Sequence, residues 1–155
     1  MITLGVGRIV ATNRKALRDY FVEETYEAGL ALQGSEVKSV RGGKVNLADS
    51  YAVVKDSEVF LVNMHISPYE YDTVVRPDPK RTRKLLLHKQ EIRKLIGKTE
   101  EKGYALVPLR VYFSGRHAKV ELGLGKGKKL FDKRREMADK TAKREIEREM
   151  KERTR

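Results

Sequence analysis

The sequence contains no cysteine among its 155 residues, which excludes disulfide bonds and thiolate metal sites. It also lacks any apolar run close to the roughly 18 to 20 residues that a membrane-spanning helix requires. The segment from Met1 to Gly7 has neither a charged start nor a long apolar stretch, so a secretory signal peptide is not expected. Together these absences predict a cytoplasmic protein without membrane segments.

Motifs of common enzyme classes are missing as well. The sequence has no G-x-S-x-G, no P-loop and no dinucleotide fingerprint. His65, His88 and His117 lie far apart in the sequence. His88 and Glu91 have an i,i+3 spacing that suits a metal, but contact of this helix face with the protein body or an RNA backbone is the better explanation. The sequence therefore predicts a protein that is not an enzyme and that binds neither a metal nor a cofactor.

Positive charge is what the sequence has in excess. It holds 34 Lys+Arg against 22 Asp+Glu, a formal charge of +12, which favours a polyanionic partner, either nucleic acid or an anionic membrane surface. Residues 126–155 contain 13 basic and 7 acidic residues, a net charge of +6, which leaves +6 for the first 125. A fifth of the chain thus carries half the net charge. We expect a globular domain over residues 1–125 and a basic tail over residues 126–155.

Apolar residues at alternate positions predict β-strands. Alternation from Tyr20 to Leu32 predicts a long half-buried strand, with a bend or bulge at Gly29. Pro108 indicates an edge position or a bulge in a later strand. Residues 55–58 have the character of a hairpin turn. The further strands expected are 46–54, 59–66, 104–113 and 118–124.

Three short helices are also expected. The first begins at Thr12 or Asn13, and the second runs from Glu36 to about Arg41 with Ser35 as its cap. The third runs from Pro79 to about residue 96, is capped by residue 78 and ends at residue 97. Antiparallel hairpins, one strongly bent strand and short helices predict a mainly β fold. We expect an antiparallel β-barrel of the oligonucleotide-binding (OB) type.

Aromatic residues among basic ones are candidate stacking platforms for RNA bases. Tyr26, Tyr69 and Tyr71 are candidates, although packing in the core explains Tyr26 equally well. Phe131 lies in a basic stretch whose glycines, Gly125 and Gly127, predict a flexible hinge. Its ring needs a partner, either the protein body or RNA, and we favour RNA. Beyond it, acid-first i,i+4 pairs favour a helix too poor in apolar residues to fold alone, so we expect a tail that is disordered when free and helical when bound.

Several blocks of the sequence resemble, in the same order, the SmpB family, the tmRNA-binding or SsrA-binding proteins. The resemblance extends from about Ile9 to Arg135. The blocks are NRKA (13–16), DYFVEETYEAG (19–29), GSEVKS (34–39), DSYA (49–52), NMHISPY (63–69), RTRKLLLH (81–88) and GKKLFDKR (127–134).

The resemblance implies an adaptor for ribosome rescue. Such a protein binds the tRNA-like domain of tmRNA, as one monomer per tmRNA, and enters stalled bacterial ribosomes to start trans-translation. Its body takes the place of the missing anticodon arm. Its tail enters the empty mRNA channel, where it becomes helical at the decoding centre of the small-subunit ribosomal RNA.

Site residues follow from the resemblance by motif. The tmRNA-binding residues implied are Asn13, Lys15, Glu36, Lys38, Arg41 and Lys119. The residues implied for the decoding centre and mRNA channel are Lys128, Lys129, Phe131, Asp132, Lys133, Arg134 and Arg135. The family often has Tyr or His where Phe131 stands, so stacking survives here without the hydrogen bond. A helix N-terminal charge is the alternative for Glu36.

Two other functions remain open from the residues alone. A structural ribosomal protein would use the tail to thread through ribosomal RNA. A barrel-type RNA-processing enzyme would depend on His65 or His88. Stable presence in all ribosomes would indicate the first function, and RNA turnover would indicate the second.

Overall fold

The structure, a computed structural model, describes residues 7–69, 77–101, 103–128, 141–148 and 151. The chain order of its elements is β1 (Ile9–Thr12), α1 (Arg14–Asp19), β2 (Tyr20–Leu30), α2 (Gly34–Arg41), β3 (Val45–Asn46), β4 (Tyr51–Lys55), β5 (Glu58–Val62), β6 (His65–Ile66), β7 (Arg83–Leu86), α3 (Lys89–Glu100), β8 (Tyr104–Ser114) and β9 (His117–Gly127).

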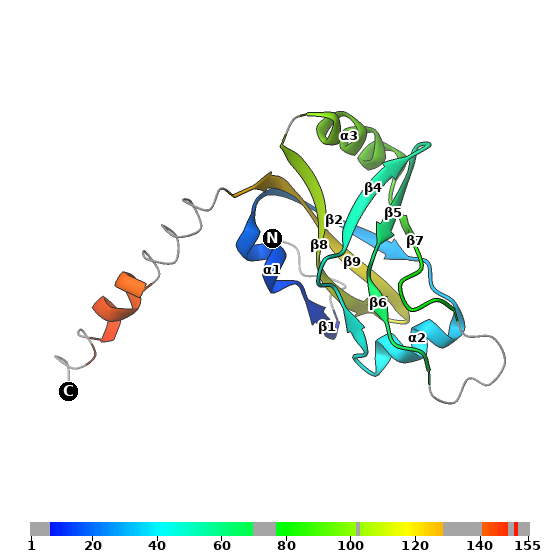
Figure 1. The fold of residues 1–155 in the computed structure, drawn as a ribbon, viewed down its shortest axis with the longest axis horizontal. Coiled ribbons are helices and arrows are strands. Elements are labelled where there is room, and N and C mark those ends of the chain that lie inside the picture. The colour runs from blue at the N-terminus through cyan, green and yellow to red at the C-terminus, as the bar shows by residue number, and fades with distance from the viewer. Residues whose placement is uncertain (1–6, 70–76, 102, 129–140, 149–150, 152–155) are drawn as a thin grey trace.

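The main sheet closes on itself. Its strand order is β1-β8-β4-β5-β7-β2-β9, and β9 pairs back with β8 to complete the ring. Every pairing is antiparallel. A separate two-stranded sheet joins β3 to β6, and α3 lies across one end of the ring (Figure 1). The predicted mainly β fold with an antiparallel barrel is confirmed.

Strand β2 has the predicted length and alternation, but its bulge lies elsewhere. The register with β9 shifts between Val22 and Glu24, so the predicted bulge at Gly29 is wrong. Gly29 instead lies between two strands, because it pairs with Lys119 of β9 on one edge and with Leu86 of β7 on the other. Pairing continues on both sides without a break in register.

Two apolar clusters hold the barrel together. The larger fills the interior and includes Tyr26, which is 8% exposed; of the two roles left open for Tyr26, core packing is the one observed. Fully buried members come from most strands, for example Val59, Leu85 and Val120. The smaller cluster lies under α1, where Ala16 packs with Val107 and Leu109 of β8. This contact fixes the position of α1 on the barrel.

The predicted helix from Pro79 to residue 96 is wrong over its first half. Residues 83–86 form strand β7, in which Arg83 and Leu85 are buried while the residues between and after them are exposed. The alternation covers only four residues, so between a proline and a helix it is too short to be recognised as a strand from the sequence. The helix itself, α3, begins after His88, whose backbone N–H donates to Glu91 in a capping box. It continues through Gly97 rather than ending there.

Two predicted strands are each divided in the structure. The expected strand 46–54 contains a turn between β3 and β4, and the expected strand 59–66 is interrupted at Asn63, whose φ is 68°. The hairpin turn at 55–58 and the bulge after Pro108 are as predicted. The cap of α2 is Gln33, not Ser35, because Gln33 and Glu36 form a reciprocal capping box.

The glycines at the end of β9 are not a hinge. Gly125 pairs with Val22 on one side and Ala105 on the other, and Gly127 pairs with Tyr20. A Cβ atom on Gly125 would lie 2.0 Å from the Phe21 carbonyl oxygen. Glycine is therefore required there for close approach of two strands, and the predicted flexibility is wrong.

Residues 141–148 of the basic tail are helical, and all their side chains are exposed. Most of the segment between β9 and this helix lies outside the described residues, as do the site residues Lys129, Phe131, Asp132, Lys133, Arg134 and Arg135. The structure therefore does not test the roles predicted for them.

Candidate nucleic-acid interface

Glu36 is buried at the N-terminal turn of α2 and is held by two arginines. Its side chain is 2% exposed, and that of Arg83 is fully buried. Arg83 Nη2 lies 2.6 Å from Glu36 Oε2, and Arg81 Nη2 lies 2.5 Å from Oε1. The Gln33 backbone N–H also donates to Oε1. Both carboxylate oxygens are thus used inside the protein.

The same cluster fixes the loops around α2. Arg83 also donates to the carbonyl oxygens of Met64, at 2.5 Å, and Pro79, at 3.1 Å. Burial alone would raise the pKa of Glu36, but hydrogen bonds from Arg81, Gln33 and Arg83 outweigh it and hold that pKa below its ordinary value. Glu36 therefore stays ionised and ties α2 to β7 and to the chain before it. We call Glu36, Arg81 and Arg83 the arginine clamp.

Asn13 is likewise a buried residue with its polar atoms engaged. It is 6% exposed. Its Nδ2 donates to the Pro108 carbonyl at 2.9 Å, and its Oδ1 accepts from the Ala16 N–H at the start of α1. The cap predicted at Thr12 or Asn13 is thus Asn13, which fixes α1 to β8.

Lys15 is exposed on α1 and pairs with Asp49. Their charged atoms are 2.8 Å apart, and their side chains are 55% and 75% exposed. The pair raises the pKa of Lys15 and lowers that of Asp49 through their hydrogen bond and mutual attraction. Exposed pairs of this kind contribute little to stability, so Lys15 can exchange this partner for a phosphate.

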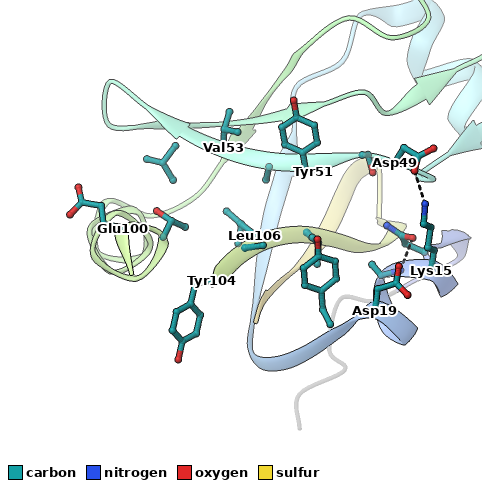
Figure 2. Close-up of a pocket in the computed structure, with 17 residues that line it drawn as sticks. Lys15, Asp19, Asp49, Tyr51, Val53, Glu100, Tyr104 and Leu106 are labelled. Carbon is teal, nitrogen blue, oxygen red and sulfur yellow. Dashed lines mark hydrogen bonds and ion pairs between the residues drawn. The ribbon is translucent and has the colours of Figure 1, made fainter. Parts of the chain in front are cut away.

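A groove of about 740 Å³ lies beside this pair, between α1, β4 and β8. Figure 2 shows Tyr51 and Val53 of β4 across from Leu106 of β8. Lys15 of α1 and Glu100 of α3 lie at its two ends. The groove exists because β4 pairs with β8 through a single residue pair, Ala52 with Leu106.

Lys38 and Arg41 are exposed on α2 and each lies over an aromatic ring. Lys38 Nζ is 5.2 Å from the centroid of the Tyr69 ring, and the Arg41 guanidinium is 5.7 Å from that of Phe113. These distances are typical of cation–π contacts. The rings hold both cations in place while leaving their charges accessible.

Lys119 is half-buried on β9, in a row that crosses four strands. It pairs with Gly29 of β2 and with Tyr112 of β8, and Gly29 pairs in turn with Leu86 of β7. Leu86 is 55% exposed although it is apolar. Glu27 accepts a hydrogen bond from the Tyr112 hydroxyl. An exposed leucine, a lysine and a carboxylate thus lie together on this part of the barrel.

The predicted site residues do not form one group, because they lie at different ends of β8 and β9. Arg41 lies over Phe113, which follows Tyr112 in β8 and is therefore on the opposite face of the sheet from Lys119, and Lys38 is on the same helix as Arg41. Lys128 lies at the opposite end of β9, where its backbone N–H donates to the Asp19 carbonyl. The structure thus separates Lys128 from Lys119 by the length of a strand.

Among the residues that the structure describes, no group of three or more His, Asp or Glu side chains is arranged to hold a metal ion. No helix within the described ranges is long and apolar enough to cross a membrane.

A family model described as SmpB protein matches residues 10–152. The chain belongs to the SmpB family. A protein of Geobacillus thermodenitrificans named SsrA-binding protein is 62% identical to it over 149 residues, which cover 96% of each chain. An SsrA-binding protein of Halothermothrix orenii is 60% identical over 148 residues, again 96% of each chain.

A solved structure extends the likeness to three dimensions. It is described as "tmRNA-SmpB: a journey to the center of the bacterial ribosome" and aligns with a TM-score of 0.67 and 53% identity. The alignment covers 80% of this chain and 87% of that chain. Sequence and fold therefore both place the chain in the SmpB family.

Sequence reasoning missed three residues that the structure brings to the site of this SmpB-family chain. Arg81 accompanies Glu36, while Leu86 and Glu27 flank Lys119. The sequence predicts a helix over Arg81 and Leu86, and this prediction hides their positions. In β7, buried and exposed residues alternate, and Leu86 takes an exposed position although it is apolar. This exposure is the signal that locates Leu86.

Proposed function

We propose that the protein is an RNA-binding adaptor that binds the tRNA-like domain of tmRNA and delivers it to stalled ribosomes for trans-translation. The observation that carries this proposal is the 62% identity, over 96% of each chain, to a protein named SsrA-binding protein. The proposed setting is the bacterial cytoplasm, with one monomer acting per tmRNA and without catalysis by the protein. The fold, charge and exposed lysines described above are consistent with this function.

The proposed tmRNA-binding surface centres on Lys119. Lysine supplies attraction to phosphates, and Glu27 beside it offers an acceptor for a base or a 2′-hydroxyl. Leu86 adds an apolar contact. Lys38 and Arg41 on α2 and Lys15 on α1 extend the positive surface.

Asn13 and Glu36 have a different role in this proposal. Both are buried, and their polar atoms bond within the protein. We assign them as positioning residues: Asn13 places α1 and Lys15, while Glu36 places α2 and Arg81. The Arg81 side chain is 28% exposed, so it can contact RNA while Glu36 holds it.

The proposed division of labour follows the domain boundaries predicted from charge. Residues 1–125 bind tmRNA, and residues 126–155 bind the ribosome. In the tail, Lys128, Lys129, Phe131 and the stretch 132–135 contact the decoding centre and the mRNA channel. The last strand extends two residues into the tail, to Gly127.

Binding to a tRNA-like fragment of tmRNA tests the proposal. The fragment is titrated with the full chain and with Lys119→Glu at several salt concentrations. Because a phosphate or base contact is lost, we expect Lys119→Glu to weaken binding by roughly tenfold and to reduce the salt dependence. Lys94→Glu is the control, since Lys94 is an exposed lysine of α3 and the charge change is the same.

The control should bind within about twofold of the unmodified chain at moderate salt. Equal losses for the two variants would show that Lys119 contributes only general charge. Failure of the unmodified chain to bind the fragment more tightly than an unrelated RNA of equal length would refute the function itself.

A further inference from the structure

Two aromatic rings and a lysine form a row across three neighbouring strands. Tyr104 of β8 pairs with Lys126 of β9, and Lys126 pairs with Phe21 of β2. Residues that face each other across an antiparallel sheet project to the same side, with strands about 4.8 Å apart. The rings therefore flank the lysine. We call Phe21, Lys126 and Tyr104 the aromatic row, and Figure 1 shows the end of the sheet where it lies, by the last residues of β9.

The aromatic row lies at the edge of the packed core, and Tyr104 packs against that core. Leu124, two residues before Lys126 on β9 and hence on the same face, is 1% exposed and belongs to the core. Phe21 is 43% exposed, Lys126 is exposed and Tyr104 is half-buried. The core face of the sheet thus continues past the core with aromatic rings open to solvent. Phe21 thus leaves much of its apolar ring in contact with solvent.

Three lysines, from α3 and from the end of β9, surround the rings. Lys98 of α3 and Lys126 lie 5.5 and 4.9 Å from the centroid of the Tyr104 ring. Lys128 lies 4.9 Å from that of Phe21.

Carboxylates also lie near the row. Glu23 accepts a hydrogen bond of 2.8 Å from the Tyr104 hydroxyl, and Glu101 and Glu24 lie close enough to act on Tyr104 electrostatically. The hydrogen bond to Glu23 orients the Tyr104 ring.

Aromatic side chains on a sheet, interleaved with cations, are the means by which several RNA-binding folds hold unpaired bases. Bases stack on the rings while lysines contact the phosphates. From this arrangement we infer that the aromatic row is a stacking platform for unpaired nucleotides of ribosomal RNA. The inference rests on the proposed function and adds a ribosome-binding surface on the barrel itself.

The position of the row favours ribosomal RNA over tmRNA. Lys126 is seven residues from Lys119 on β9, which corresponds to about 24 Å along a strand. The centre of the proposed tmRNA surface, at Lys119, therefore lies at the other end of β9. Lys128, by contrast, begins the proposed ribosome-binding tail immediately after β9. A platform at this point is continuous with the RNA that the tail contacts.

Phe21→Ala in the full chain tests the inference. Its binding to isolated small ribosomal subunits and to the tRNA-like tmRNA fragment is compared with that of the unmodified chain. Because one stacking contact is lost, affinity for the subunits should fall by roughly tenfold, whereas affinity for the fragment should change by less than about twofold. Phe60→Ala is the matched control, since Phe60 is a half-buried ring on β5 outside both the row and the groove, and it should leave both affinities unchanged.

Phe21→Tyr retains a ring and should restore subunit binding, which separates stacking from general damage to the strand. Unchanged subunit binding by Phe21→Ala would overturn the inference. Loss on the tmRNA fragment instead of the subunits would also overturn it, because the row would then belong to the tmRNA surface. If the unmodified chain binds neither RNA, the proposed function fails; if it binds both and only the Phe21 result is negative, the function stands without this platform.

Discussion

The arginine clamp places a buried negative charge next to a buried positive one. Glu36 and Arg83 lie 2.6 Å apart and are almost completely excluded from solvent. The pair is held by further hydrogen bonds from Arg83 to two carbonyl groups. Removal of the carboxylate leaves the arginine charge without compensation, and this costs far more than the loss of an exposed pair. The stability of the structure around α2 thus depends on the Glu36 side chain.

We predict that Glu36→Gln lowers the free energy of unfolding by about 3–5 kcal/mol. Urea unfolding followed by circular dichroism measures the change. The control is Glu58→Gln, which removes an exposed pair with Lys84 whose charged atoms are 3.2 Å apart. It should change stability by less than about 1 kcal/mol. Similar values for the two variants would contradict the role of the clamp.

The pH dependence of unfolding provides a second readout for the same variant. The pKa of Glu36 is lower in the folded protein than its ordinary value of 4.5. Its contribution is therefore fully present above pH 4.5 or so and is lost as the pH falls through the lower, folded-state pKa. The stability difference between the unmodified chain and Glu36→Gln should shrink below about pH 4.5. A difference that stays constant down to pH 3 would exclude this linkage.

Strand β9 is the element on which barrel closure depends. It pairs with β2 on one side and β8 on the other, so its backbone lies between two neighbours along most of its length. Gly125 allows β2 to approach β9 closely at the bulge of β2. The Phe21 carbonyl of β2 lies where a Cβ atom of residue 125 would be. A glycine in a strand at such a close approach has a packing reason rather than a need for flexibility.

We predict that Gly125→Ala destabilises the barrel by about 1–3 kcal/mol, because backbone atoms of β2 must move to admit the methyl group. Thermal unfolding measures the effect. Gly34→Ala is the control, since a Cβ at Gly34 meets nothing within 4 Å and alanine favours the helix that begins there. Unfolding of Gly125→Ala at the same temperature as the unmodified chain would show that the strands are not in contact.

How much of the fold could be predicted differs between elements. Long alternating stretches such as Tyr20–Leu30 gave their strands correctly, because a period of two over many residues has one explanation. Strand β7 could not be found, since only Arg83 and Leu85 face inward and one of them is charged. The partners of Glu36 lie 45 and 47 residues away. No local pattern indicates a contact at that separation, so the burial of Glu36 could not be predicted.

At the scale of the whole molecule, two parts of equal net charge have different structures. The barrel carries its charge on a folded surface. In the tail, residues 141–148 form a helix with exposed side chains, and this helix has three basic and two acidic residues, a net charge of +1 out of the +6 of the tail. The family resemblance predicted the partners, and the division at residue 125 stays a prediction from the charge pattern. Neither predicted that β9 crosses the boundary, because glycines at 123, 125 and 127 suggest a linker until their neighbours are known.

We predict that a chain ending at Lys128 keeps its fold and its affinity for the tRNA-like tmRNA fragment within about threefold, since the tail adds mainly nonspecific attraction. The cut leaves β9 complete and keeps the Lys128 N–H bond to Asp19. The same truncation should abolish peptide tagging in a reconstituted translation assay with stalled ribosomes. Tagging by the truncated chain would contradict a role for the tail on the ribosome, and loss of fragment binding would contradict the proposed division of labour.

The pairing of β2 with β9 also affects how the chain is made. Leu30 ends β2, and Gly127 ends β9 97 residues later, so synthesis at about 5–20 residues per second leaves β2 waiting roughly 5 to 20 s for its partner. An unpaired apolar strand edge is a template for aggregation during that time. Glu23, Glu24 and Glu27 are exposed along β2. Their charges repel a second nascent chain until the last strand arrives.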